Sequence, residues 1–119
     1  MYNVYVKNDK ISVNDFIEML DHYTIVSENE IWIFDDSKKY PCLSLLLAND
    51  NVAVHYFRND SDAGSISVNK NTLKSNECIF FNDICLDKKY IIDRKKAIKC
   101  IDQFVIDGER PSVIDWFEL

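Results

Sequence analysis

The sequence predicts one α+β domain, built from a mainly antiparallel sheet of six or seven strands with two helices packed against it. Several short segments alternate apolar and polar residues, as strands do, and two longer segments show the 3.6-residue period of amphipathic helices. Turn-forming Asn and Asp residues separate the strand segments. The chain has 119 residues, 47% of them hydrophobic, with two glycines and two prolines. We therefore expect a single domain over residues 1–119 without a flexible linker.

The first part of the chain predicts a strand, a turn and a helix. Tyr2, Val4 and Val6 alternate with residues of the other face, which predicts a strand, and residues 8–10 predict a turn. Ser12 is a favourable N-cap for the helix that follows. The apolar stripe of this helix consists of Val13, Phe16, Ile17, Leu20 and Tyr23. His22 lies near the end of the helix, where a positive charge is favoured.

The middle of the chain predicts a series of antiparallel strands. Residues 43–48 are a continuous apolar run, which is typical of a central strand buried on both faces. Residues 49–51 form a strong turn signal, so the strand over 52–58 should pair back as a hairpin. The other predicted strands cover residues 30–34, 64–68 near an edge of the sheet, and 77–81. Polar connections are expected over residues 35–39, 59–63 and 69–76, and residues 84–90 should lead into the second helix.

The last part of the chain predicts a helix with a defined end and a closing strand. Asp93 is a suitable N-cap, and Gly108 stands where a left-handed residue would end the helix. Pro111 cannot continue a helix, and residues 113–116 predict a short strand. The apolar stripe of this helix consists of Ala97, Ile98, Ile101, Phe104 and Val105.

These C-terminal residues resemble the signature of the Imm1 family of bacterial immunity proteins. The family pattern runs from an alanine through a polar residue plus Phe and a Gly-x-Arg-Pro to a hydrophobic residue just before Trp. The matching residues are Ala97, Gln103, Phe104, Gly108, Arg110, Pro111 and Trp116. In the middle of the chain, Pro41 before the apolar run, the pair His55-Tyr56 and the pair Gly64-Ser65 are similar too. The chain departs from the family where Ser, Asn and Asp replace expected glycines and tryptophans.

The matching residues have ordinary structural explanations. Gly108 allows a positive φ, Pro111 makes the turn rigid, and Trp116 packs against the sheet. Arg110 caps the last helical carbonyls or pairs with a nearby acid. We therefore expect Ala97, Phe104 and these residues to maintain the fold and not to contact a toxin.

The charge distribution argues against nucleic-acid binding. The formal net charge is −6; residues 1–87 hold 7 basic and 14 acidic residues, and residues 88–119 hold 7 basic and 6 acidic residues. An acidic surface repels phosphates and favours a basic protein partner. The basic residues of the C-terminal quarter fit the outer face of an amphipathic helix; they include Lys88, Lys89, Arg94, Lys95, Lys96 and Lys99.

The spacing of the cysteines predicts whether the chain binds a metal, and the length of its apolar runs predicts its cellular location. Cys42, Cys78, Cys85 and Cys100 match no CxxC pattern, so we expect reduced, partly buried thiols and neither a metal nor a cofactor. The N-terminal residues lack the pattern of a signal peptide, and no apolar run is long enough to span a membrane. We expect a cytoplasmic protein without a membrane partner.

The resemblance implies a function in binding, without catalysis. It implies an immunity protein of a polymorphic-toxin or contact-dependent growth inhibition system, which binds the C-terminal domain of a cognate toxin, with 1:1 stoichiometry expected. Such toxins are often nucleases or nucleic-acid deaminases, and occlusion of a basic active site or substrate path would neutralise them. The candidate contacts are acids that crowd the loops at strand ends: Asp35, Asp36, Asp50, Asp60, Asp62 and Asp83.

Two alternatives to an immunity protein remain open at this point. One is a small enzyme, such as a hydrolase that uses His55 with a nearby carboxylate, and the other is a generic protein-binding scaffold. A deep pocket around His55 would favour the enzyme, whereas a flat acidic face would favour the inhibitor. Most aromatic residues should lie in the core, but exposed aromatics inside an acidic rim would be typical of a tight interface. The conspicuous aromatics are Trp32, Phe34, Tyr40, Tyr56, Phe57, Phe80, Phe81, Trp116 and Phe117.

Overall fold

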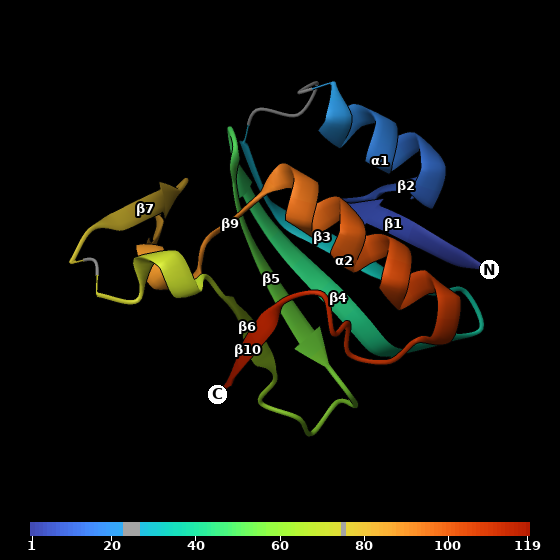
Figure 1. Cartoon of the computed structure of the whole chain (residues 1–119). Helices are drawn as coiled ribbons and strands as arrows, with labels where there is room; N and C mark the ends of the chain where they lie inside the picture. Colours follow the sequence, from blue (N-terminus) through green and yellow to red (C-terminus); the bar gives the residue numbers. More distant parts are fainter. Residues whose placement is uncertain (23–26, 75) are drawn as a thin grey trace.

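The computed structural model of the chain describes residues 1–22, 27–74 and 76–119 and confirms the α+β class (Figure 1). Tyr23, which we assigned to the first helical stripe, lies outside the described residues, as does one residue of the predicted loop over 69–76. The elements in chain order are β1 (Tyr2–Val6), β2 (Asp9–Ser12), α1 (Val13–Asp21), β3 (Ser27–Asp35), β4 (Lys38–Ala48), β5 (Asn51–Phe57), β6 (Ser65–Val68), η1 (Lys70–Thr72), β7 (Cys78–Phe81), β8 (Ile84–Asp87), η2 (Lys88–Tyr90), β9 (Ile92–Asp93), α2 (Arg94–Asp107) and β10 (Asp115–Glu118).

The main sheet has eight strands within the described ranges, so the predicted six or seven was slightly low. Its order is β10-β6-β5-β4-β3-β1-β2, and β9 pairs with β5 beside β6. Every pairing in the sheet is antiparallel. The additional strands are short: β2 begins inside the predicted turn over residues 8–10, because the chain already reverses at Lys7, which has a φ of 56°. As predicted, β6 lies close to an edge, next to the edge strand β10.

Both helices lie on the same face of the sheet and enclose the main core (Figure 1). Phe16 and Leu20 of α1, and Ile101 and Phe104 of α2, are fully buried against the sheet. The predicted central strand is β4, which is buried on both faces: Leu43, Leu45 and Leu47 point to the helices, and Leu46 and Ala48 point to the opposite face. Successive residues of a strand point to opposite faces, and both faces of β4 are covered. Apolar residues are therefore favoured at every position, which explains the continuous apolar run.

The predicted ends of the helices are confirmed. The Ser12 hydroxyl accepts a hydrogen bond from the Asp15 amide at 3.1 Å, and the Asp93 carboxylate accepts one from the Lys96 amide at 2.8 Å. Gly108 ends α2 with a φ of 73°. The closing strand begins at Asp115, later than predicted, because the Gln103 side chain holds the amides of the preceding segment, at Ser112 and Val113, in a turn.

The hairpin β7–β8 lies on the face of the sheet opposite the helices. Its first strand was predicted, over residues 77–81, but its second strand was not. The hairpin covers part of that face and makes a second, smaller core with the sheet, formed by Leu46, Ala48, Ala53, Phe81 and Ile91. The expectation that all four cysteines are reduced was wrong, because Cys78 and Cys85 form a disulfide. In the hairpin, Cys85 lies opposite Phe80, so Cys78 and Cys85 are diagonal neighbours whose Cα atoms are 6.0 Å apart, a proximity that their sequence spacing alone does not reveal. Cys42 and Cys100 are free and buried, as expected.

Arg94 contradicts the prediction that the whole basic run faces solvent. Its side chain is 3% exposed, whereas Lys95, Lys96 and Lys99 of α2 are exposed and Lys88 and Lys89 are half-buried. The guanidinium donates to the Leu20 carbonyl at 2.8 Å and to the Asn49 carbonyl at 2.6 Å. It therefore joins the end of α1, the β4–β5 turn and the start of α2. No helix among the described residues is long and apolar enough to cross a membrane.

Candidate functional site

The half of the sheet face that neither the helices nor the β7–β8 hairpin covers carries a group of aromatic side chains. The register aligns one residue from each strand in a row across this face: Lys10, Tyr5, Trp32, Ser44, His55, Ile66 and Phe117. Directly opposed residues of antiparallel strands point to the same side, so this row is continuous. We call the group formed by Tyr5, Trp32, Phe34, His55 and Phe57 the aromatic face.

The rings of the aromatic face hold one another in place. Tyr5 and Phe34 stack with centroids 4.4 Å apart, and the Phe57 ring lies 6.0 Å from Trp32 and 6.1 Å from His55. Trp32 remains 36% exposed, and the other four side chains are half-buried. An uncovered sheet face normally carries polar residues. Ordered, partly exposed aromatic rings at this position are typical of the centre of a binding interface.

Gly64, in the loop after β5, lies directly against the Phe57 ring of the aromatic face. It has a φ of 91°, and a Cβ atom there would lie 2.7 Å from the Phe57 ring. The ring packs directly on the glycine backbone, which explains on physical grounds a glycine that the sequence suggested only through the family resemblance.

The rim of the aromatic face contains both signs of charge. The Lys39 ammonium lies 6.0 Å from the Trp32 ring centroid and 5.9 Å from that of Tyr40. The Tyr5 hydroxyl donates to Asp36 at 2.6 Å, and Lys10 pairs with the same carboxylate at 3.2 Å. The face is thus apolar and aromatic in its centre, with a rim of paired charges and not of acids alone.

His55 packs within the aromatic face, with its ring stacked on that of Phe57. It lies in the row between Ser44 and Ile66, and burial lowers the pKa of its imidazole, so it is neutral at pH 7. His55 does not line the hollow at the start of α2 or four other hollows formed by described residues. His22, the other histidine, is the C-cap residue of α1, as its sequence position suggested.

Asp35 and Asp36, two of the candidate contacts, hold the β3–β4 turn together. Asp35 accepts hydrogen bonds from the Ser37 amide and hydroxyl and pairs with the N-terminal ammonium, and these bonds lower its pKa to about 2. Asp36 accepts from Tyr5, Asn3 and Lys10, and the Tyr5 bond contributes most to its lowered pKa. Both carboxylates are engaged within the chain.

The other four candidate contacts are spread over three loops. Asp62 accepts from the Arg58 and Gly64 amides, which lower its pKa, and Asp60 accepts from the Ser61 hydroxyl. Asp50 and Asp83 make no side-chain hydrogen bond or ion pair in the described residues.

The fold does not bring the six aspartates together. Asp36 precedes β4 and Asp50 follows it, so they lie at opposite ends of an 11-residue strand, roughly 35 Å apart. Asp83 is in the separate β7–β8 hairpin.

The residues of the C-terminal signature make contacts within the chain. Ala97 and Phe104 are fully buried, and the Trp116 indole donates to the Pro111 carbonyl at 2.7 Å. Arg110 forms an ion pair with Glu118 and lies 5.9 Å from the Trp116 ring. Arg110 was expected either to cap the last helical carbonyls or to pair with a nearby acid, and the ion pair with Glu118 is the second of these roles.

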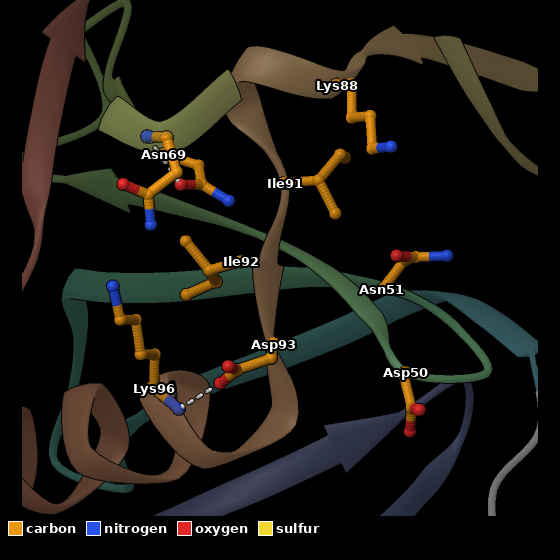
Figure 2. A pocket seen from close by; sticks show the side chains of 9 residues that line it. Asp50, Asn51, Asn69, Lys88, Ile91, Ile92, Asp93 and Lys96 are labelled. Carbon is orange, nitrogen blue, oxygen red and sulfur yellow. Dashed lines mark hydrogen bonds between the residues drawn. The ribbon is translucent and has the colours of Figure 1, made fainter. Parts of the chain in front are cut away.

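A separate polar hollow lies at the start of α2 (Figure 2). It has a volume of about 280 Å³ and a floor of Ile91 and Ile92, surrounded by Asp50, Asp93, Lys88, Lys96 and three asparagines. The Asp93 carboxylate already accepts from the Lys96 amide, as the dashed line in Figure 2 shows. Charges of both signs face this hollow, so it favours no particular ion. No group of three or more His, Cys, Asp or Glu side chains within the described ranges could hold a metal ion.

A scan against models of protein families finds no match to this chain, and a search of curated proteins finds no similar sequence. The resemblance to the Imm1 family therefore rests on the residues quoted above and stays a prediction.

Proposed function

We propose that this chain is an immunity protein, which binds a toxin domain and neutralises it by covering its active site or substrate path. The observation that carries this proposal is the aromatic face: five ordered rings on an uncovered half of a sheet, in a protein with a net charge of −6. Two of the five rings belong to Trp32 and Tyr5, and Trp and Tyr are among the residues most often found at the energetic centre of an interface. The C-terminal resemblance to Imm1 supplies the class of partner.

The expected binding mode follows from the distribution of rings and charges. Trp32 and Phe57 would form the desolvated centre, and the charged groups around them, Lys39 and the Lys10–Asp36 pair, would form the hydrated rim. The net negative charge acts at longer range and accelerates the encounter with a basic toxin. Because four of the six candidate aspartates hold loops within the chain, we assign the affinity mainly to the rings and the association rate to the overall charge.

The proposal is tested with the product of the gene immediately upstream, co-purified with the tagged protein and titrated calorimetrically at low and high salt. We expect 1:1 binding with a Kd on the order of nanomolar, weakened by salt. Trp32→Ala should weaken binding about thirtyfold, the usual effect of losing a central aromatic anchor.

The matched control for Trp32→Ala is Ile106→Ala, which removes an 81% exposed apolar side chain from α2. It should leave the affinity unchanged. Absence of binding by a folded sample, or equal affinity of the Trp32→Ala and Ile106→Ala variants, would refute the assignment of this face.

A further inference from the structure

A second hollow lies between the edge strand β10 and the short helices η1 and η2. Its volume is about 520 Å³, which is within the range of small-molecule sites. Strands β6 and β10 supply one side, and η2 with the residue that follows η1 supplies the other. We call it the C-terminal hollow; it is lined by Val68, Lys70, Leu73, Lys89, Tyr90, Asp115, Trp116 and Phe117.

The walls of the C-terminal hollow are apolar and partly aromatic. The rings of Tyr90 and Phe117 lie against each other with centroids 6.0 Å apart. Phe117 is 50% exposed and Leu73 is 52% exposed, so two large apolar side chains present much of their surface to water. A flat ring laid on this surface would remove apolar area from water without rearrangement of the backbone.

The charges at the hollow are predominantly positive. Lys70 lies 3.5 Å from Asp115, and the Lys89 ammonium lies 5.1 Å from the centroid of the Tyr90 ring. No acidic partner of Lys89 is present in the described part of the chain. The lining of the hollow thus contains two ammonium groups, both from the side formed by η1 and η2, and one carboxylate, from β10, in a protein that is acidic as a whole. A ligand with a negative group next to its apolar part complements this arrangement.

We propose that the C-terminal hollow binds a planar aromatic anion. The ring of the ligand lies against Phe117 and Leu73, and its anionic group lies toward Lys89 and Lys70. A neutral ring would gain only the weak attraction between an ammonium group and a ring face, and a cationic ring would be repelled by the two lysines. This site shares none of the five rings of the aromatic face, although Phe117 ends the row that contains His55, and it does not depend on the proposed function.

The test uses 8-anilino-1-naphthalenesulfonate, a planar aromatic anion whose fluorescence rises in an apolar site, and its uncharged relative N-phenyl-1-naphthylamine. The folded protein should bind the sulfonate saturably at one site and the neutral probe more weakly. The double variant Lys70→Gln/Lys89→Gln should bind the sulfonate about tenfold more weakly, without a change for the neutral probe. Leu73→Ser should weaken both probes about fivefold.

Two control variants remove similar groups from residues of α2 that do not line the hollow: Lys95→Gln removes an exposed lysine and Ile106→Ser an exposed apolar side chain. Both should bind the sulfonate as the parent protein does. Competition with adenosine monophosphate and with indole-3-acetate distinguishes a phosphate-bearing from a carboxylate-bearing ligand, and displacement by either supports the site. The proposal is overturned if binding is not saturable, if the hollow and control variants bind alike, or if neither competitor displaces the probe.

Discussion

Replacement of Arg94 by methionine tests whether one buried guanidinium joins the two helices to the sheet. The guanidinium donates to the carbonyls of Leu20 and Asn49 at 2.8 and 2.6 Å, and the side chain is 3% exposed. Methionine preserves most of the apolar stem and removes both hydrogen bonds. A hydrogen bond to a charged group contributes about 1.5–3 kcal/mol, so the lower end of that range for two bonds predicts a loss of about 3 kcal/mol.

Burial of a charge has its own cost, and the replacement of buried ionic groups by apolar ones is sometimes neutral. Here we expect the loss of the two hydrogen bonds to outweigh the relief of charge burial. The Leu20 carbonyl is at the C-terminal end of α1, where the helix dipole also favours a positive charge. The free energy of unfolding from urea titration should fall by about 3 kcal/mol, which moves the midpoint by about 2 M.

The control for Arg94→Met is Lys95→Met, the adjacent but exposed position of α2. That variant should change the free energy of unfolding by less than about 0.5 kcal/mol. If both variants have the same stability as the parent protein, Arg94 does not stabilise the junction and our interpretation of its hydrogen bonds is wrong.

Three further predictions concern the backbone, the pH dependence and the thiols. Gly108→Ala should lower the free energy of unfolding by about 2 kcal/mol, because the residue has a φ of 73° and its new Cβ would lie 2.6 Å from the Tyr2 hydroxyl. The comparison is Ala63→Gly, in the β5–β6 loop. If both variants lose the same free energy of unfolding, the positive φ and the Tyr2 contact of Gly108 do not explain its effect. The pKa of Asp35 is about 2 in the folded chain, below its ordinary value of 3.8, so its contribution is complete above pH 3.8 and is lost as the pH falls through about 2. In urea titrations at several pH values, Asp35→Asn should therefore be less stable than the parent protein at pH 7 and equal to it near pH 2, and a pH-independent difference would argue against this pKa shift. The unfolded, unreduced protein should titrate with two thiols, from Cys42 and Cys100, and with four after reduction, which should also lower stability by about 2 kcal/mol; four thiols before reduction would show that the Cys78–Cys85 bond does not form.

Local elements were predicted well because the residues that specify them are neighbours in sequence. Ser12 and Asp93 cap the helices they precede, and Gly108 ends α2, since each acts on amides or carbonyls within one helical turn. The apolar run of β4 also carried its own signal. Short elements such as β2, β8 and β9 were missed because two to four residues give too little periodicity to distinguish a strand from a turn.

The candidate site was predicted less well than the fold. The six aspartates were chosen because they lie in loops, but the carboxylates of Asp35, Asp36 and Asp62 bind neighbouring groups of the chain. The aromatic face was not predicted from the sequence. The only expectation was that aromatic residues, if exposed, would be typical of an interface. Which rings remain exposed depends on where the β7–β8 hairpin covers the sheet, and the pattern of single strands does not contain that information.

The sequence by itself determined the class of the fold, the two helices with their caps, the long central strands and the acidic net charge. These properties depend on residue type and on spacings of a few residues. Only the tertiary structure decided the order of the strands, the burial of Arg94, the Cys78–Cys85 pair and the alignment of Tyr5, Trp32 and His55 in one row. Each of these joins segments that are distant in sequence or separated by a turn, and their proximity results from the packing of the whole chain on the two faces of the sheet.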